Sequence, residues 1–537
     1  MPGTTPEKRR KRLRNLSKNS NVKKPSAAAS KSLHSSYVKV NITNDPPSLD
    51  LYEINHKAGL DEYMFQGDIN FDERQLDQIT SSLSAGNRKK RQVSKVAPLW
   101  PEKIVYYYFD SVNPVGSEIK ETVRIAIQFL ESKTCIKFVE DQNAFNRIRI
   151  INGVGCYSNV GMTGGDQALS LGSGCNLDGI VAHELSHALG VFHAQMRSDR
   201  DDYVTVDVTD VPLDLRQNFI KFTEAESLNY TEYEYGSYMQ YSSRAFVTSG
   251  GVDSIVPNDP IYVYTMGGRI VTFSDIKVLN THYSCSCEGS TLACENGGYP
   301  NPADCSVCNC PYGFSGQLCT ERPDYQCGST LAATDKWQSE SFTFGDESNI
   351  KSARTTFDYC VYWITAPVGK QIQFRIDEAT NTQCGYGCTF NGIEPRLKLD
   401  QTMTQPRYCC DEFNGEIHNA ETNPMPVIAY NRYYLTSYKF SYKYVDMEKP
   451  SCKDLSDKET CLKLNNEQCS LYNQSQLKVM CAETLGLCGK MVMDVCEDRF
   501  TDKECLDYKL SGRCASDAPL IAEYNCAKTC GFCETPV

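Results

Sequence analysis

Three of the chain's seven histidines lie within eleven residues, in the pattern H-E-x-x-H-x-x-G-x-x-H. On a helix, His183 and His187 lie one turn apart and project from one face, and Glu184 lies beside them. Gly190 can adopt the left-handed conformation that ends a helix, so that the chain turns back and brings His193 up as a third ligand. Three neutral imidazoles bind a zinc ion and leave one position open for water, as a catalytic zinc site requires.

A surface helix that carries histidines by chance is the plain alternative. H-E-x-x-H alone is only a moderate signal, because so short a motif recurs in unrelated chains. The glycine and the third histidine, each at a set spacing, make chance a poor explanation of the full motif. The motif therefore predicts a hydrolase with one catalytic Zn2+ ion, in which Glu184 is the general base.

Length and composition limit the classes of protein to consider. A chain of 537 residues is too long for one ordinary domain, so several units are expected. The net charge of −12 argues against nucleic acid as a partner. No run of eighteen apolar residues occurs, so no membrane-spanning helix is predicted.

The cysteines indicate the compartment. Of 27 cysteines, four lie at or before residue 285 and 23 lie after it. Such density in small units is typical of disulfide frameworks, which form in an oxidising compartment. Structural zinc knuckles are the alternative, but the close cysteine pairs do not repeat with the spacing of such knuckles. We therefore expect a secreted, disulfide-bonded protein.

The first residues of the chain conflict with this expectation. They form a basic tract, Lys8–Arg14, where a secretory signal would have an apolar segment. Such a tract is typical of nuclear or polyanion-binding segments, yet a nuclear protein with this many cysteines is implausible. A true start upstream of this sequence and export by another route both stay open.

Residues 1–91 carry little periodic apolar pattern and end in a basic cluster, Arg88–Arg91, of the kind that furin-like convertases cut. A solvated charge run is the alternative, but the position ahead of a folded region favours a processing site. From Trp100 onward short strands and helices follow each other irregularly, so we expect an α+β domain. The expected elements are strands at 104–109, 136–139 and 148–151, a helix over 119–130 that Ser117 caps, and the histidine helix from about residue 180.

Further motifs surround the histidines. They are the segments 156–158 and 170–175, R-S-D-R-D-D-Y-V at 197–204, S-Y-M-Q-Y at 237–241, T-M-G at 265–267 and Y-S-C at 283–285. With the zinc motif, these segments resemble the astacin family of metzincin zinc endopeptidases. The resemblance covers residues 92–286 and implies an α+β metzincin fold with zinc metalloendopeptidase activity (EC 3.4.24.-).

The resemblance assigns roles by position. His183, His187 and His193 would bind the zinc ion. Met239 would lie beneath them as an apolar floor, although a lone methionine is most often core filler. Tyr241 would be the phenol that ligates zinc at rest and swings away to stabilise the developing oxyanion.

The resemblance also implies two disulfides and an inhibitory segment. The disulfides are Cys135–Cys285 and Cys156–Cys175. Phe65–Ile69 resembles the family's inhibitory F-x-G-D motif, whose aspartate, here Asp68, would occupy the open zinc position. A carboxylate is a good zinc ligand and would displace the nucleophilic water. Residues 1–91 would then be an N-terminal region and propeptide.

One position departs from the family pattern. The family usually has glutamate after the third histidine, where it pairs with the new amino terminus once the propeptide is removed. Ala194 occupies that position here, so this charge pair cannot form in the usual way. Gln92 would be the first residue after cleavage, and it can cyclise and lose its charge, which is consistent with a site that needs no such pair.

Two modules are expected after the peptidase domain. Residues 287–320 end in C-x-C-P-Y-G-F-S-G-Q-L-C and resemble an EGF-like unit, which implies the pairs Cys287–Cys305, Cys294–Cys308 and Cys310–Cys319. Residues 327–445 resemble a CUB domain, an all-β sandwich with a Cys327–Cys360 bridge. Four extra cysteines allow three pairings: Cys384, Cys388, Cys409 and Cys410.

The chain ends in an internal repeat of two small, disulfide-rich helical units. Residues 496–533 have the cysteine spacing of a ShKT domain, which implies the pairs Cys496–Cys533, Cys505–Cys526 and Cys514–Cys530. Residues 452–488 repeat this spacing with Leu485 in place of the fifth cysteine. Cys469 thereby loses its expected partner, and we expect a free thiol or an intermolecular disulfide that forms a dimer.

These observations predict the secreted zymogen of a zinc endopeptidase that hydrolyses extracellular proteins. A furin-like convertase would activate it by cleavage after Arg91. Matrix or cuticle proteins are the natural substrate class by analogy with nematode astacins of similar tail architecture. Sequons at Asn41, Asn229 and Asn473 predict N-glycosylation.

Two other functions fit parts of the sequence. A non-catalytic adhesion or matrix protein with a vestigial peptidase domain is favoured only by Ala194, and the intact set of His, Glu, Met and Tyr residues argues against it. A channel blocker is suggested by the ShKT units. Related blockers use a lysine–tyrosine pair, but residues 515–525 contain no lysine, and Val479 follows Lys478 in the first unit.

Overall fold

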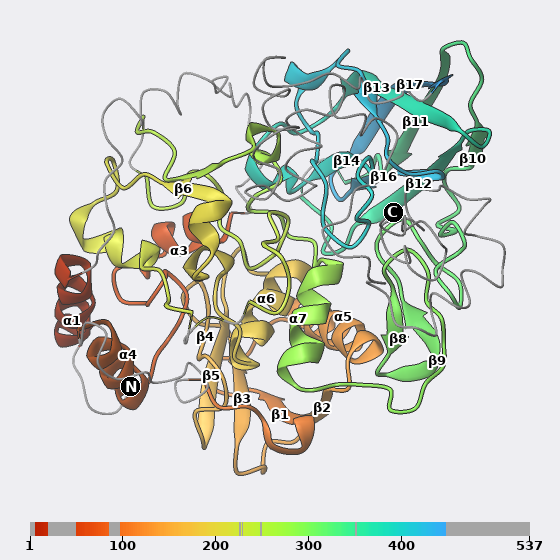
Figure 1. Cartoon of the computed structure of the whole chain (residues 1–537). Helices are drawn as coiled ribbons and strands as arrows, with labels where there is room; N and C mark the ends of the chain where they lie inside the picture. The colour runs from red at the N-terminus through yellow and green to blue at the C-terminus, as the bar shows by residue number, and fades with distance from the viewer. Residues whose placement is uncertain are drawn as a thin grey trace, which may run out of the picture. The chain divides into compact units, whose positions relative to one another are not determined.

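The computed structural model describes residues 6–19, 50–84, 97–224, 227, 229–247, 250–349 and 352–446 (Figure 1). The chain divides into two compact units, one of Met1–Thr365 with Ile372–Lys443 and one of Ala366–Gln371 with Tyr444–Val537. The predicted processing site at Arg91, both predicted ShKT units, Cys469, Asn41 and Asn473 lie outside the described residues. None of the helices described is both long enough and apolar enough to span a membrane.

A five-stranded sheet is the scaffold of residues 97–285. Its strands are β1 (Ile104–Phe109), β2 (Lys137–Glu140), β3 (Arg147–Ile151), β4 (Cys156–Ser158) and β5 (Asp166–Leu171). The strand order is β2-β1-β3-β5-β4; the first four strands run parallel, and β4 runs antiparallel to β5 at the edge. The three predicted strands correspond to β1, β2 and β3 with ends shifted by at most one residue.

Two helices share one apolar core with this sheet: α5 (Ser117–Lys133) and α6 (Asp178–Ala188). Helix α5 is amphipathic and buries Val123, Ile127 and Leu130. The predicted capping by Ser117 is wrong. Gly116 has the extended conformation of an N-cap, and Ser117 is already the first helical residue.

The remaining elements of this domain are mostly short. They are the 3-10 helices η2 (Pro101–Lys103), η3 (Ala194–Met196), η4 (Arg200–Asp202), η5 (Leu213–Phe219) and η6 (Pro260–Tyr262), the paired strands β6 (Val204–Val206) and β7 (Ile255–Pro257), and helix α7 (Phe273–His282). Helix α7 begins with a capping box, in which Thr272 and Asp275 satisfy each other's backbone N–H groups.

The N-terminal segment, residues 6–19 and 50–84, forms three helices although its sequence shows little periodic pattern. They are α1 (Pro6–Asn19), α3 (Leu51–Lys57) and α4 (Glu73–Ser84). Leu13 and Leu16 of α1 are buried in a cluster that includes Phe71 of the same segment and Phe192 and Phe222 of the peptidase domain. Tertiary packing, which a helical repeat does not reveal, accounts for this order.

The basic tract on α1 is engaged within the protein. Its ion pairs include Arg10–Glu62 (2.5 Å), Arg12–Glu73 (2.7 Å) and Arg14–Asp214 (2.5 Å), and Arg12 also pairs with Asp77. The guanidinium of Arg9 is buried and donates to the backbone carbonyl oxygens of Tyr63 (2.6 Å) and Phe71 (2.7 Å). These contacts explain the tract without a nuclear or polyanion-binding role.

A small disulfide unit, residues 287–320, follows the peptidase domain. It contains the antiparallel strands β8 (Tyr299–Asn301) and β9 (Asp304–Asn309) and the disulfides Cys287–Cys305, Cys294–Cys308 and Cys310–Cys319. The side-chain amides of Asn301 and Asn309 donate to the carbonyl oxygens of Ser132 (2.8 Å) and Lys133 (2.9 Å). The unit thereby satisfies carbonyl groups at the C-terminal end of α5.

Residues 327–446 form a β-sandwich, called the sandwich below. One sheet has the order β10-β12-β16-β14 and the other β11-β17-β13-β15. The elements are β10 (Thr330–Ala332), β11 (Gln338–Gly345), β12 (Asp358–Thr365), β13 (Lys370–Thr380), η7 (Tyr386–Cys388), β14 (Asn391–Pro395), η8 (Asp411–Phe413), β15 (His418–Asn419), β16 (Met425–Asn431) and β17 (Leu435–Asp446). Three disulfides brace it: Cys327–Cys360, Cys384–Cys410 and Cys388–Cys409. The last two select one of the three pairings that the sequence left open.

Candidate metal centre

Three imidazoles meet between α6 and the turn that follows it. His183 and His187 lie one turn apart on α6, and the chain leaves the helix through Gly190, whose φ of 97° is left-handed. His193 then returns toward them, with its Nε2 atom 3.2 Å from that of His183. All three histidines are buried. The helical spacing and the glycine turn together produce this convergence.

Each imidazole is oriented through its other ring nitrogen, Nδ1. The partners are the carbonyl oxygen of Tyr238 for His183 (2.8 Å), that of Val191 for His187 (2.8 Å) and the side-chain oxygen of Gln66 for His193 (2.7 Å). Because all three partners are acceptors, each Nδ1 carries the proton and each Nε2 presents its lone pair to the centre.

The carboxylate of Asp68 closes the centre from the N-terminal segment. Its Oδ2 atom lies 3.1 Å from Nε2 of His193 and 3.3 Å from that of His183. Its Oδ1 atom lies 3.5 Å from Nε2 of His187. Burial alone would raise the pKa of Asp68, but the neighbouring histidines outweigh it and hold that pKa well below its ordinary value. That direction requires protonated imidazoles; with the three Nε2 lone pairs turned to the centre, a bound cation would take over this role.

These four side chains suit a zinc ion. Their ligand atoms lie within 4.8 Å of one another. Nε2 of His187 and Oδ1 of Asp68 are buried and have no hydrogen-bond partner within the described part of the chain. Burial lowers the pKa of His183 to about 3, so its imidazole is neutral. Neutral imidazoles and a carboxylate are donors that zinc prefers, and a cation here would satisfy the orphaned atoms.

The Asp68 loop, residues 65–69, is tightly constrained. Phe65 and Ile69 exchange two backbone hydrogen bonds, each 2.9 Å long. Gly67 has a φ of 81°, and a Cβ atom there would lie 3.1 Å from the ring of Phe246. The F-x-G-D motif thus needs its glycine both for the left-handed backbone and for space.

The Asp68 loop also covers the edge of the five-stranded sheet. The N–H of Ser158 donates to the carbonyl oxygen of Asp68 (3.1 Å), and the N–H of Asn70 donates to that of Ser158 (2.8 Å). The side chain of Asn55 bonds both backbone groups of Cys156, at 2.7 and 2.8 Å. The hydrogen-bonding groups of β4 that an extended peptide could use are therefore occupied.

Two further side chains face the centre. Glu184 is buried, and neither of its carboxylate oxygens has a hydrogen-bond partner among the residues described. Burial, reinforced by the charge of Asp68, raises the pKa of Glu184 well above its ordinary value. The hydroxyl of Tyr241 donates to the carbonyl oxygen of Gln66, and its ring centre lies 4.4 Å from that of His193. The N-terminal segment thus holds Tyr241 as well.

The S-Y-M-Q-Y segment supports the centre from the core side. Met239 is buried in the apolar cluster that contains α6, and its carbonyl oxygen accepts from the N–H of Ala194 at 2.9 Å. The hydroxyl of Tyr238 bonds to Ser186 on α6, and its carbonyl oxygen orients His183. Sequence reasoning missed this role, since a backbone carbonyl group leaves no signal in residue type.

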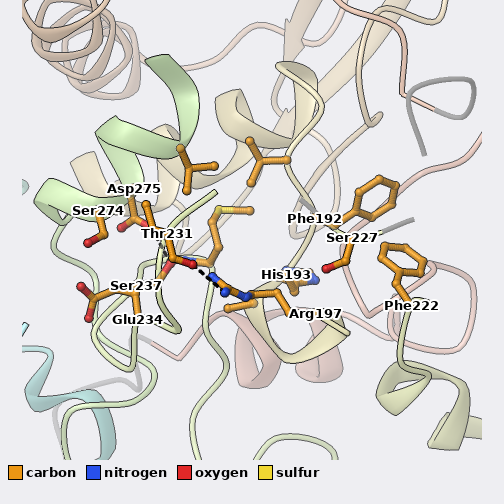
Figure 2. A pocket seen from close by; sticks show the side chains of 14 residues that line it. Phe192, His193, Arg197, Phe222, Ser227, Thr231, Glu234, Ser237, Ser274 and Asp275 are labelled. Atoms are coloured by element: carbon orange, nitrogen blue, oxygen red, sulfur yellow. Dashed lines mark hydrogen bonds between the residues drawn. The ribbon is translucent and has the colours of Figure 1, made fainter. Parts of the chain in front are cut away.

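A cavity of about 70 Å³ lies beside His193 (Figure 2). Met239 and Ala194 form part of its wall. Two buried carboxylates, Glu234 and Asp275, also line it. Both accept hydrogen bonds: Glu234 from the N–H groups of Gly236 and Thr404, and Asp275 from the hydroxyls of Ser237 and Thr272. Gln92 lies outside the described residues, so the effect of Ala194 on a new amino terminus stays a prediction.

Arg269 is a charged residue of the centre that sequence reasoning missed. It is only 3 % exposed, and its charge acts on Glu184 and His193. Asp50 of the N-terminal segment contributes the largest charge that acts on Arg269 in return. The only available signal was its place two residues after the T-M-G segment, because no spacing rule links it to the histidines.

Comparison with known proteins agrees with this geometry. Residues 92–284 match the peptidase family described as Astacin. Zinc metalloproteinase nas-32 of Caenorhabditis elegans is 59% identical over 544 aligned positions, which cover 100% of this chain and 83% of that protein. This chain belongs to the astacin family. As an astacin it is a zinc metalloendopeptidase with one catalytic zinc ion, and His183, His187, His193 and Asp68 form a group that could hold a metal ion.

Other zinc proteases are similar over parts of the chain. Zinc metalloproteinase nas-17 of C. elegans is 38% identical over 74% of this chain and 90% of its own length. The solved structure of High choriolytic enzyme 1, a hatching enzyme zinc-protease from Oryzias latipes, is 34% identical, with a TM-score of 0.33, and covers 37% of this chain and 100% of its own. Residues 495–533 match a family described as ShK domain-like. That match overlaps the second predicted ShKT unit, while the first stays a prediction.

Proposed function

We propose that this chain is the latent form of a secreted zinc endopeptidase, with the N-terminal segment as its propeptide. The observation that carries the proposal is the carboxylate of Asp68, whose oxygens lie 3.1 to 3.5 Å from the three imidazole Nε2 atoms. The same segment covers strand β4 and holds Tyr241. Its removal would free the metal position, the substrate-binding edge and the phenol together.

Catalysis then uses groups already in place. Bound zinc supplies the Lewis acidity that polarises the peptide carbonyl group and acidifies water. Glu184 accepts the proton of the attacking water and returns it to the leaving amine. The hydroxyl of Tyr241, released from Gln66, donates to the carbonyl oxygen as that oxygen becomes negative. Strand β4 offers its backbone groups to an extended substrate.

The proposed activation step is cleavage after Arg91 by a furin-like convertase. Its support is the basic cluster at 88–91, which directly precedes the astacin match at residue 92. Activation would also remove Gln66, the acceptor at Nδ1 of His193. We expect a water molecule to replace Gln66, since a zinc-binding imidazole needs such a partner to keep its orientation.

The cysteines support export of the protein. Every cysteine of the described residues belongs to one of eight disulfides, as is typical of secreted proteins. Asn229 is exposed, which suits glycosylation. We interpret the small disulfide unit as EGF-like and the sandwich as a CUB domain. With the ShKT units they would bind extended extracellular proteins, of the matrix or cuticle class.

Zinc-dependent cleavage by the processed chain is the test of this function. The full chain, purified from a secreting host and cleaved at Arg91, should hydrolyse a denatured protein mixture, lose that activity to a chelator and regain it with Zn2+. The uncleavable variant Arg91→Ala is the matched control and should stay latent. A processed, zinc-loaded chain that cleaves nothing would instead support a non-catalytic adhesion or matrix role.

The prediction that Cys469 is a free thiol or forms an intermolecular disulfide needs a separate test. Thiol labelling of the intact protein, combined with a non-reducing gel, should find either a modified Cys469 or a disulfide-linked dimer. An unlabelled Cys469 in a monomeric chain would mean that this cysteine has a partner within the chain.

A further inference from the structure

The sandwich and the peptidase domain pack against each other through an apolar cluster. Its members from the peptidase domain are Val263, Tyr264 and Ile270. Its members from the sandwich are Tyr430 and the disulfide-bonded cysteines Cys388, Cys409 and Cys410. The two disulfides that exceed the expected CUB bridge therefore brace the surface on which the peptidase domain packs.

A second contact joins the sandwich to the Met239 turn, residues 236–241. The N–H of Thr404, in the sandwich, donates to Oε2 of Glu234 at 3.0 Å. The N–H of Gly236 donates to Oε1 of the same carboxylate at 2.9 Å. Glu234 is only 4 % exposed. One buried carboxylate thus links the backbone of the sandwich to the first residue of the turn.

Gly236 lets the Met239 turn lie directly against Thr404. A Cβ atom at this glycine would lie 2.5 Å from Cγ2 of Thr404 and 2.7 Å from its Cβ and Oγ1 atoms. Such distances are shorter than close packing allows, so a larger residue at this position would push the turn and the sandwich apart. The contact is therefore steric as well as hydrogen-bonded.

The far side of the turn is held by helix α7. The hydroxyl of Ser237 donates to Oδ1 of Asp275 at 2.5 Å, and the N–H of Tyr238 donates to Oδ2 at 3.3 Å. The N–H of Met239 donates to the hydroxyl oxygen of Ser237 at 3.0 Å. Figure 2 shows Glu234, Ser237 and Asp275 grouped on one side of the cavity. The turn is thus held between α7 and the sandwich.

The backbone of the Met239 turn contacts two histidines of the metal centre. The carbonyl oxygen of Tyr238 accepts from Nδ1 of His183 at 2.8 Å. The carbonyl oxygen of Met239 accepts from the N–H of Ala194, the residue directly after His193, at 2.9 Å. A shift of the turn would therefore move the acceptor that orients His183 and the backbone beside His193.

Two more contacts fix the sandwich beside these elements. Arg432, which is fully buried, lies 3.2 Å from the carboxylate of Asp178, the first residue of α6. The backbone N–H of Arg407 donates to the hydroxyl oxygen of Thr265 at 3.0 Å. The sandwich therefore contacts both the helix that carries His183 and the turn that orients it.

We propose that Glu234 is a positioning residue for the metal centre and that the sandwich, through Thr404, is a structural part of that centre. The carboxylate of Glu234 ties the Met239 turn to the sandwich, and the turn keeps His183 in the orientation that zinc needs. The affinity of the peptidase domain for zinc then depends on the sandwich. This dependence goes beyond the proposed function, because it holds in the uncleaved chain as well as in the processed one.

The test measures the affinity of the full, uncleaved chain for Zn2+ by competition with a chromogenic chelator. Gly236→Ala should push the turn away from Thr404 and raise the dissociation constant about tenfold, because the acceptor that orients His183 is displaced. The visible absorption spectrum of the cobalt-substituted chain should change as well, because that spectrum reports the geometry of the ligands.

A second substitution tests whether the effect passes through the sandwich. Thr404→Gly removes the three side-chain atoms that lie nearest to a Cβ at Gly236 and keeps the N–H that bonds to Glu234. Gly236→Ala combined with Thr404→Gly should therefore regain the wild-type affinity and spectrum. Gly116→Ala is the matched control, because a Cβ atom there meets nothing within 4 Å. It should change neither readout.

Two further measurements separate this effect from misfolding. Glu234→Gln keeps only one of the two acceptor oxygens, so it should weaken zinc binding in the same direction, and it decides the case if Gly236→Ala fails to fold. Removal of zinc from the wild-type chain should speed hydrogen exchange at residues 402–407 but not in β11, because coupling between two sites is reciprocal.

Three results would overturn the inference. They are wild-type zinc affinity in the folded Gly236→Ala or Glu234→Gln chain, a double variant that binds zinc as weakly as Gly236→Ala alone, and exchange at residues 402–407 that does not respond to zinc. None of these results bears on the proposed latency, which is tested separately by cleavage at Arg91.

Discussion

Helix α6 and the Asp68 loop each bring a buried carboxylate to the same three imidazoles, but they are anchored in different ways. Every residue from Gly179 to Ala188 of α6 is buried, so Glu184 belongs to the core of the domain. Asp68 is held through backbone bonds to edge strand β4 and through contacts of the N-terminal helices. This difference is what the proposed function requires: Glu184 would be a permanent base and Asp68 a removable ligand, because only Asp68 depends on contacts at the domain's edge.

Helix α1 adds further contacts that hold the Asp68 loop in place. Arg9 bonds to the carbonyl oxygens of Tyr63 and Phe71, which flank the Asp68 loop on both sides. Arg14 pairs with Asp214 of the peptidase domain at 2.5 Å. The basic helix therefore ties the Asp68 loop to the peptidase domain over a long sequence separation.

Removing the carboxylate of Glu184 should have the largest effect on kcat. Glu184→Gln in the processed chain should lower kcat roughly a thousandfold, because the water loses its general base. Zinc content should stay at one ion per chain, as measured by atomic emission, because Glu184 is not a ligand. Glu121→Gln, an exposed glutamate on α5, is the control. Appreciable peptidase activity in Glu184→Gln would contradict the role assigned to α6.

Removing the hydroxyl of Tyr241 should have the second-largest effect on kcat. Tyr241→Phe should lower kcat about a hundredfold, with zinc still bound, because the developing oxyanion loses a donor. Tyr325→Phe, an exposed tyrosine outside the peptidase domain, should leave kcat unchanged. If Tyr241→Phe kept the wild-type kcat with a large change in KM, the hydroxyl would serve substrate binding instead.

Weakening the removable ligand should have a smaller effect of opposite sign. Asp68→Ala in the uncleaved chain loses a charge-assisted contact worth about 1.5 kcal/mol, so the basal peptidase activity should rise about tenfold. Asp61→Ala is the matched control, since Asp61 is equally buried in the N-terminal segment but pairs with His56. Equal activation by the two variants would mean that loosening of the segment, and not loss of a zinc ligand, opens the site.

Loosening helix α1 should change the basal peptidase activity least. Arg9→Ala in the uncleaved chain should raise basal activity about threefold, because the two bonds beside the Asp68 loop are lost while Asp68 itself remains. Faster hydrogen exchange at residues 63–71 should accompany it. Lys8→Ala, at an exposed neighbouring position, should do neither. An Arg9→Ala chain with wild-type exchange would show that α1 does not restrain the loop.

The sequence predicted the elements that are determined by residues close together in the chain. The spacing of His183, His187 and Gly190 sets one helix and one turn, and both occur in the structure. Strands β1 and β3 follow from runs of β-branched and aromatic residues. Local geometry suffices for such elements, because the residues that determine them are neighbours in sequence.

The features that could not be predicted from the sequence depend on contacts between residues far apart in the chain. Arg9, Arg269 and Arg407 are single charged residues whose partners are set by the fold, and no periodicity marks them. The pairing of Cys384 with Cys410 likewise required the positions of the strands, since spacing alone allowed three choices. The helices described before residue 92 show little periodic apolar pattern in the sequence, because they are ordered chiefly by burial against the peptidase domain.

The most direct measurement of the central claim is a crystal structure of the uncleaved chain with zinc bound, with data collected at the zinc absorption edge. The account predicts one anomalous peak at about 2.0–2.2 Å from Nε2 of His183, His187 and His193 and from a carboxylate oxygen of Asp68. After cleavage at Arg91 the peak should keep the three histidines and lose Asp68. A zinc ion bound elsewhere, or one that binds the histidines without Asp68 in the uncleaved chain, would contradict it.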